Sequence, residues 1–330
     1  MTMASSSMSA ALRHELEGLA WPDRFERLAK AEARAETPDD RAQVGRVRAE
    51  WAERAIEELR PDWGSLPLKE AILRLPSKRM RGALGQAAKR LRDRSIAEVA
   101  ARGGMPDLGT LETPGFGRGL DERVVEIPLA LAVARLTEPG EVLDAGFALN
   151  VPVVREIVGR PVARITHFTL PGSKEPVLAG DEDRFVQAFG DLRGMPYGDA
   201  SFDRVVCVST LEHVGLDNAR FGAVAERAPD TAHRAVSELI RVLSPGGELL
   251  ITVPYGHSAD HGWFRVFDAA TLDELLSPLA PYRPDVRFIY YGDGWATGGS
   301  EPPPGLGDGW SSDVVTGVAI VRAVKTGSAH

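Results

Sequence analysis

Apolar and polar positions change their pattern near residue 120. Beyond it, short apolar runs alternate with amphipathic segments of helical length. This alternation is typical of a parallel sheet whose strands are joined by helices. Strands are expected near 141–144, 163–168, 185–189, 204–209 and 247–253, with helices near 123–136, 151–159, 215–225 and 231–242.

The pattern changes again after residue 260. A helix is expected over 268–280, and two more strands near 286–291 and 313–324 flank a long loop rich in Gly and Pro. Strands that are joined by a loop without a crossover helix pair antiparallel. The sequence therefore predicts an α/β fold with a seven-stranded, mostly parallel sheet and an antiparallel C-terminal strand.

Residues before 102 predict helices. Residues 10–101 are rich in Ala, Arg, Glu and Leu, which favour helix, and prolines such as Pro61 should interrupt them. The longest helix should run from Asp39 to about Leu59, whereas residues 1–8 are expected to be disordered. We divide the chain into a helical N-terminal appendage (1–101), a linker or lid (102–120) and a main domain (121–330).

Residues 78–92 carry six basic side chains on a predicted helix. Two interpretations are open. The basic face contacts an anionic lipid, glycan or nucleic acid, or it pairs with acids of the same protein, which is the commoner case.

Composition narrows the class of protein. The chain has 330 residues, 43% hydrophobic content and a formal net charge of −8. The negative charge argues against a nucleic-acid partner. No apolar stretch approaches the ~18 residues of a membrane span, and the first residues lack a signal-peptide core, which indicates a cytoplasmic protein. The single cysteine, Cys207, is interpreted as a buried structural thiol.

Residues 141–150, EVLDAGFALN, are the most informative stretch. Asp144 ends a short apolar run, and Gly146 follows it in a turn of small residues. An acid at the carboxyl end of a parallel strand, with a glycine that lets backbone approach a ligand, is typical of a cofactor loop. A plain strand-to-helix turn remains the alternative. The G-x-G-x-x-G pattern of a dinucleotide loop is absent.

Two further blocks follow in order, at 190–215 and 241–256. Together the three blocks resemble the class I S-adenosylmethionine-dependent methyltransferases, over roughly residues 120–325. The resemblance implies a Rossmann-like sheet and S-adenosylmethionine as the cofactor.

The resemblance also implies which residues bind the cofactor. These are Glu126 before the first strand, Asp144, Gly146 and Asn150 in the first loop, Asp191 and Leu192 beside the adenine, and Thr210, Leu211 and Glu212 after the fourth strand. For Glu126, an exposed acid in a helix's first turn is the alternative interpretation.

Two departures from the family pattern stand out. Ala148 replaces a glycine of the first loop, and the second strand does not end in the acid that holds the ribose. Two alternatives are open: Thr169, which stands near that position, replaces the acid, or other residues hold the ribose.

The catalytic residues are expected on the segment 254–268, which leaves the fifth strand's carboxyl end. His257 or His261 is predicted to act as the base, with Asp260 orienting the ring. His213 is a further candidate. Glu212 and His213 also resemble part of a metal cluster whose first acid is replaced here by Ser209. No metal is predicted, and a site for Mg²⁺ or a transition metal that His257 completes is the alternative. Trp295 and Trp310 are expected to form a platform or lid for the acceptor.

The function predicted from these features is methyl transfer to an oxygen, such as a sugar or secondary-metabolite hydroxyl. The partner is then a small-molecule or carbohydrate acceptor, and the N-terminal helices are candidates for homo-oligomerisation. Two alternatives remain: a catalytically silent binding module that kept the sheet, and a hydride-transferring enzyme, which the missing dinucleotide loop disfavours.

Overall fold

The computed structural model describes residues 3–63, 67–75, 77–103, 107–172, 183–219, 222, 228, 231–306, 310–311 and 314–326. The chain divides into two compact units. Unit 1 comprises residues 1–94 and 119–121, and unit 2 comprises residues 95–118 and 122–330. Each is described by itself.

Helices build unit 1. They are α1 (Met3–Glu17), α2 (Trp21–Arg34), α3 (Pro38–Trp63), α4 (Leu68–Leu73) and the larger part of α5 (Lys78–Ala101). Their apolar faces meet in a core that includes Leu16, Phe25, Leu28, Val47 and Trp51.

Two expectations for this region are wrong. Helix α1 already begins at Met3, within the segment expected to be disordered. Helix α3 starts at Pro38, where a proline is tolerated, and continues past Pro61 to Trp63 instead of ending near Leu59.

The basic residues of 78–92 pair largely within their own unit. Arg79 bridges to Glu26, and Arg90 bridges to Glu53. Arg92 contacts Asp121 at 3.1 Å. These pairs favour the interpretation in which the basic face neutralises acids of the same protein.

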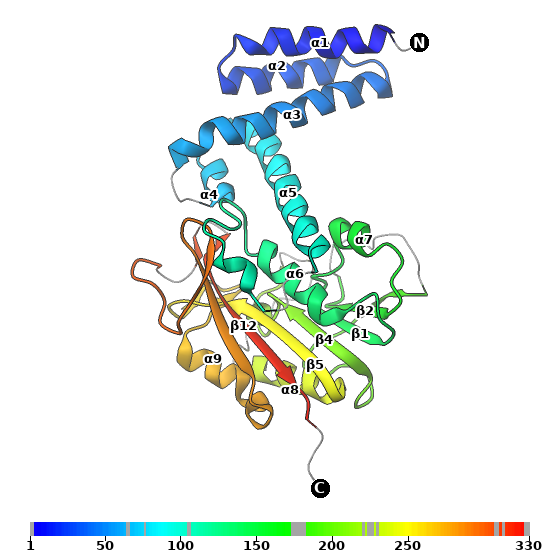
Figure 1. Cartoon of the computed structure of the whole chain (residues 1–330), viewed down its shortest axis with the longest axis vertical. Helices are drawn as coiled ribbons and strands as arrows, with labels where there is room; N and C mark the ends of the chain where they lie inside the picture. The colour runs from blue at the N-terminus through cyan, green and yellow to red at the C-terminus, as the bar shows by residue number, and fades with distance from the viewer. Residues whose placement is uncertain are drawn as a thin grey trace. The chain divides into compact units, whose positions relative to one another are not determined.

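An eight-stranded sheet forms the centre of unit 2 (Figure 1), in the order β3-β2-β1-β4-β5-β12-β8-β9. The strands are β1 (Glu141–Ala145), β2 (Arg164–Thr169), β3 (Phe185–Phe189), β4 (Phe202–Val208), β5 (Leu243–Pro254), β8 (Asp285–Tyr291), β9 (Trp295–Gly298) and β12 (Gly317–Val324). The strands β3 to β5 in this order pair in parallel, whereas β12 is antiparallel to both β5 and β8.

This order confirms the predicted fold class. Strand β12 inserts between β5 and β8, so the last long strand lies inside the sheet. The eighth strand, β9, occupies the start of the segment expected to be a loop, and it pairs antiparallel with β8.

Helices cover both faces of the sheet. They are α6 (Arg123–Ala134), α7 (Pro152–Val158), α8 (Ala232–Val242) and α9 (Ala269–Leu276), with short 3₁₀ turns at η1 (Gly109–Glu112), η2 (Leu211–His213) and η5 (Ser277–Tyr282). Two small hairpins complete the described elements, β6 (Ala259–Asp260) with β7 (Arg265–Val266), and β10 (Trp310–Ser311) with β11 (Val314–Val315). Of the helix expected over 215–225, residues 215–219 and 222 are described, and they form turns and irregular backbone instead of an α-helix, so the expectation is wrong there. The remaining residues lie outside the described part of the chain.

Side chains alternate along the central strands and thereby separate the two faces. Leu143, Val205 and Cys207 pack with α8 and α9 in the main apolar core. Asp144 and Thr252 therefore point to the opposite face. Cys207 is fully buried, and its burial raises the pKa of the thiol, as expected for a structural cysteine.

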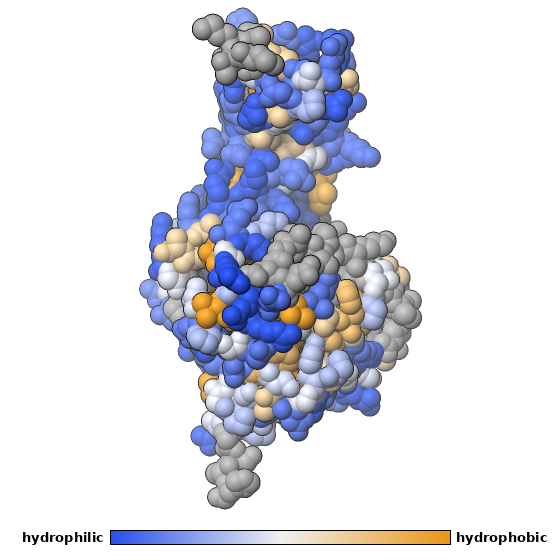
Figure 2. Space-filling model, turned by 90° about the vertical axis from the view of Figure 1, so that its right-hand side faces the viewer, coloured by the Kyte–Doolittle hydropathy of each residue, from blue (hydrophilic) through white to orange (hydrophobic). Residues whose placement is uncertain are grey.

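The surface is mainly hydrophilic on the face drawn in Figure 2, where apolar side chains gather in small groups. Among the described residues, the large apolar side chains that are exposed are Leu73, Val162, Phe189 and Val324. In the same part of the chain, no helix combines the length and the apolar character that crossing a membrane requires.

Candidate active site

The strand order reverses its direction between β1 and β4. From β1 the chain proceeds to β2 and β3 on one side, whereas β4 and β5 lie on the other. In open α/β sheets, ligands bind outside the carboxyl ends of the strands at such a switch point. We call this place the switch edge, defined by residues 144–150 after β1 and 209–213 after β4.

Asp144 lies at the end of β1 and is completely buried. Its Oδ2 atom accepts a hydrogen bond from the Leu149 backbone N–H at 3.0 Å and contacts His167 Nδ1 at 2.7 Å. Its Oδ1 atom has no hydrogen-bond partner among the described residues. The carboxylate therefore ties the loop 145–149 to the sheet through one oxygen.

His167 was not singled out by the sequence. It lies in β2, directly beside Asp144 in the strand register, and is 2% exposed. Its ring stacks on Phe185 and meets Phe147 edge-on. Because this contact depends on the register of β1 against β2, no local pattern indicates it.

Gly146 brings the two loops of the switch edge into contact. Its φ is +110°, a region that favours glycine. A Cβ atom added here would lie 2.6 Å from Thr210 Cγ2 and 2.7 Å from Thr210 Cβ. The neighbouring Phe147 also has a positive φ, +73°, and its carbonyl accepts from the Asn150 N–H. The loop thus reaches its shape without the further glycines of the family pattern.

Glu126, on α6, is completely buried, which contradicts the interpretation as an exposed acid. Its Oε1 accepts from Ser209 Oγ at 2.7 Å and from Thr252 Oγ1 at 2.6 Å. Its Oε2 accepts from Arg123 Nη1 at 2.9 Å. Glu126 therefore links α6 to the ends of β4 and β5.

The loop after β4 places Glu212 in the interior. Ser209 opens it with φ +41°, and Leu211 is fully buried. Glu212 is 3% exposed, and its Oε2 has no hydrogen-bond partner among the described residues. Desolvation raises the pKa of Glu212 well above its ordinary value, and the charge of Glu126 adds to this.

His213 is held in one tautomer. Its Nδ1 lies 2.8 Å from the backbone oxygen of Trp263, and its ring stacks on the Trp263 indole. A carbonyl oxygen only accepts, so Nδ1 carries the proton and Nε2 of the neutral ring keeps a lone pair. Nε2 is 3.9 Å from Glu212 Oε1. This arrangement suits a general base.

The other predicted bases lie on or near the β6–β7 hairpin. His257 is exposed. Asp260 accepts from the Gly262 N–H at 2.7 Å and thereby shapes the turn. His261 stacks on Phe264, with ring centroids 4.7 Å apart. Asp260 thus stabilises the turn. Its predicted role, to orient the ring of His257 or His261, stays a prediction.

Asp191 follows β3 and forms an ion pair with Arg193. The Arg193 Nε atom lies 3.0 Å from Asp191 Oδ1, and this hydrogen bond lowers the pKa of the carboxyl. Leu192 is 7% exposed and belongs to the main core. Strand β2 ends at Thr169, which is half-buried.

Comparison with known families identifies part of this unit. Residues 173–251 match the family model described as a methyltransferase domain. The segment includes β3, the Asp191 loop, β4, η2, α8 and most of β5. Over this segment the chain is similar to methyltransferase domains. This confirms the resemblance seen in the sequence, whereas the loop after β1 lies outside the matched segment.

Solved structures with a similar arrangement have diverse activities. They include 1,6-didemethyltoxoflavin-N1-methyltransferase of Burkholderia thailandensis with bound S-adenosylhomocysteine (17% identity, 74% of this chain and 90% of that chain, TM-score 0.39). A S-adenosylmethionine-dependent methyltransferase of Methanosarcina mazei (16%, 58% and 94%, 0.38) and the (4+2)-cyclase SpnF (17%, 60% and 79%, 0.38) are further examples. At these identities and TM-scores, they do not assign an activity to unit 2.

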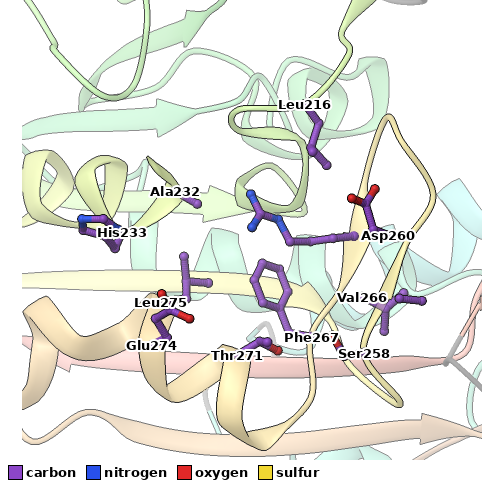
Figure 3. Close-up of a pocket in the computed structure, with 12 residues that line it drawn as sticks. Leu216, Ala232, His233, Ser258, Asp260, Val266, Phe267, Thr271, Glu274 and Leu275 are labelled. Atoms are coloured by element: carbon purple, nitrogen blue, oxygen red, sulfur yellow. The ribbon is translucent and has the colours of Figure 1, made fainter. Parts of the chain in front are cut away.

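A pocket of about 200 Å³ has none of the switch-edge residues in its lining. Its lining comes from the β6–β7 hairpin, the loop after η2, α8 and α9, and Figure 3 shows Asp260, Leu216 and Leu275 around it. Asp260 is the predicted site residue among its lining. The pocket combines the carboxylates of Asp260 and Glu274 with apolar side chains such as Phe267.

Two further expectations concern unit 2. Trp295 is 1% exposed, and its backbone N–H donates to the Phe116 carbonyl, so the expectation of a lid is wrong for this residue. The Trp310 side chain lies outside the described residues. Within the described ranges, no three His, Cys, Asp or Glu side chains group as metal ligands.

Proposed function

We propose that unit 2 binds S-adenosylmethionine at the switch edge and transfers its methyl group to an acceptor. The observation that carries this proposal is the convergence of Asp144, Glu126 and the loop 209–213 at one edge, in a domain whose central segment matches methyltransferases. When bound, this donor supplies an electrophilic methyl group on a positively charged sulfur.

The residues present fit such a cation. Asp144 Oδ1 and Glu212 Oε2 are buried acceptor atoms without a hydrogen-bond partner among the described residues. Buried polar groups are normally paired, so an unpaired acceptor close to a switch point favours a ligand that carries positive charge or donors.

We assign the remaining donor contacts by position. Backbone of Gly146 and the Asn150 amide face the methionine part, with Glu126 ordering α6 behind it. Asp191 and the Leu192 N–H hold the adenine, for which Asp191 must share or exchange its contact with Arg193. Thr210, Leu211 and Glu212 border the sulfur, and Thr169 stands nearest to the ribose.

For the acceptor we propose a hydroxyl of a sugar or secondary metabolite. Alignment of the acceptor oxygen and removal of its proton are the main tasks left to the protein. His213 is our first choice as base because a backbone carbonyl fixes its tautomer. His257 and His261, with Asp260, remain the second choice.

Isothermal titration calorimetry of the full chain tests the donor. We expect S-adenosylmethionine and S-adenosylhomocysteine to bind and NAD not to bind. Binding of NAD alone would support hydride transfer. Failure of all three to bind a folded protein would remove the donor assignment, and donor binding without methyl transfer to any hydroxyl in a carbohydrate and phenol panel would favour a silent binding module.

A further inference from the structure

Glu212 is the buried acid that the proposed function places beside the donor sulfur. It is 3% exposed, and the loop after β4 turns it inward. A carboxylate that lacks a hydrogen-bond partner on one oxygen is costly to bury, whereas a protonated carboxyl is much less so. The geometry alone therefore favours the neutral form of Glu212 in the empty protein.

The charged and titratable groups around Glu212 also favour its neutral form. Glu122, which precedes α6, and Arg123 and Glu126 on α6 act electrostatically on it. His213 Nε2 stands 3.9 Å from its Oε1. Arg123, the nearby cation, is already engaged by Glu126 at 2.9 Å. No described partner therefore neutralises an ionised Glu212 in full.

Two further ionisable groups belong to the same neighbourhood. Cys207 lies on β4 and Asp144 near the end of β1, and the charges of Glu212 and Asp144 both raise the pKa of the Cys207 thiol. With Glu126 on α6, which contacts Ser209, three buried carboxyl groups lie at or next to the switch edge. Such a site favours a cationic ligand over a neutral one of the same shape.

We propose that Glu212 holds a proton while the donor site is empty or contains the demethylated product, and releases it when the sulfonium donor binds. The proposal rests on the donor assignment made above. The cause is electrostatic, because a positive charge nearby stabilises a carboxylate and a neutral thioether does not.

The proton balance of methyl transfer is consistent with this cycle. The carbon–sulfur bond breaks and its electron pair stays on sulfur, which becomes neutral, while a lone pair of the acceptor oxygen forms the new bond. The oxygen then loses its proton, and Glu212, no longer facing a cation, takes up one proton. Each turnover thus returns Glu212 to the neutral state in which the next donor finds it.

Calorimetry can count the protons. The full chain is titrated with S-adenosylmethionine and with S-adenosylhomocysteine in two buffers of different ionisation enthalpy, at several pH values between 6 and 9. Both ligands carry the amino and carboxyl groups of methionine, and the protons that these groups exchange are subtracted by comparison with Glu212→Gln. We expect up to one more proton released with the donor, and a donor affinity that rises by up to about tenfold per pH unit below the pKa of Glu212.

Glu212→Gln is the decisive variant, because glutamine keeps the shape and cannot ionise. It should abolish the difference in proton release, and Glu138→Gln, an exposed acid, should not. Equal proton release for both ligands in the wild type, or an unchanged difference in Glu212→Gln, would overturn the inference while leaving donor binding intact. If neither ligand binds, the proposed function itself fails.

A second measurement covers the case in which Glu212→Gln does not fold. Difference infrared spectroscopy of the wild-type protein should show loss of a protonated-carboxyl band on addition of S-adenosylmethionine and no loss with S-adenosylhomocysteine. The same spectrum for both ligands would contradict the inference.

Discussion

At the residue scale, Asp144 shows that an acid of a cofactor-loop motif can also stabilise the backbone of its own loop. Its contacts with Leu149 N–H and His167 Nδ1 are internal. Asp144→Ala leaves two buried donors unpaired, at about 1–3 kcal/mol each, and should therefore lower both the free energy of unfolding and the donor affinity. Urea denaturation and calorimetry measure the two effects.

Asp203→Ala is the matched control for Asp144→Ala. Asp203 also accepts a backbone hydrogen bond, from Glu141 N–H at 2.9 Å, but it is exposed at the opposite end of the same strands. Asp203→Ala should leave the donor affinity unchanged. Wild-type donor affinity in a folded Asp144→Ala protein would contradict the proposed position of the donor site.

Substitutions can distinguish whether His213 or the exposed His257 acts as the base. His213→Gln should lower turnover by roughly 10²–10⁴-fold without changing donor affinity, because glutamine cannot take up a proton. His257→Gln should stay near wild type. The reverse result in single-turnover methyl-transfer assays would transfer the role of base to the hairpin.

The pH dependence of stability gives another test of Glu212. Its pKa in the folded protein lies well above the ordinary 4.5, so the folded state binds more protons than the unfolded state. Glu212 therefore contributes stability that is present below about pH 4.5 and is lost as the pH rises through the folded pKa. Glu212→Gln should remove this loss of stability. Urea titrations measure the free energy of unfolding of both proteins, and a difference between them that stays constant across pH would contradict the raised pKa of Glu212.

At the element scale, the loops after β1 and β4 can contact each other because Gly146 has no side chain. Gly146→Ala would place a Cβ against Thr210 and force a residue other than glycine to φ +110°. We expect lower stability and at least tenfold weaker donor binding. Gly159→Ala is the control, since Gly159 also has a positive φ, +59°, but nothing lies within 4 Å of an added Cβ.

The elements themselves were largely predictable from the sequence, because helix and strand periodicity are local. β3 was expected at 185–189 and lies at Phe185–Phe189. β9 was missed because Trp295–Gly298 is short and surrounded by glycines, so only its pairing with β8 reveals it. The contacts of Glu126 with Ser209 and Thr252, and of Asp144 with His167, join residues distant in sequence, which no local pattern encodes.

At the scale of the whole molecule, the division into two units predicts independent donor binding. A protein that begins at Ser95, the first residue of unit 2, should fold and bind the donor within about threefold of the full chain, an energy difference below ~1 kcal/mol. Circular dichroism and calorimetry test this. A folded truncation with no donor affinity would show that unit 1 contributes to the site, and sedimentation of both proteins would show whether unit 1 mediates self-association.

The position of β12 also constrains how this protein is synthesised. As a nascent chain leaves the ribosome, β5 and β8 are complete long before the strand that separates them. Until then both present unpaired backbone edges, which are prone to join other chains. Closure of the sheet is thus a late, non-local step, and a translational pause or a chaperone acting before residues 317–324 emerge would decide between folding and aggregation.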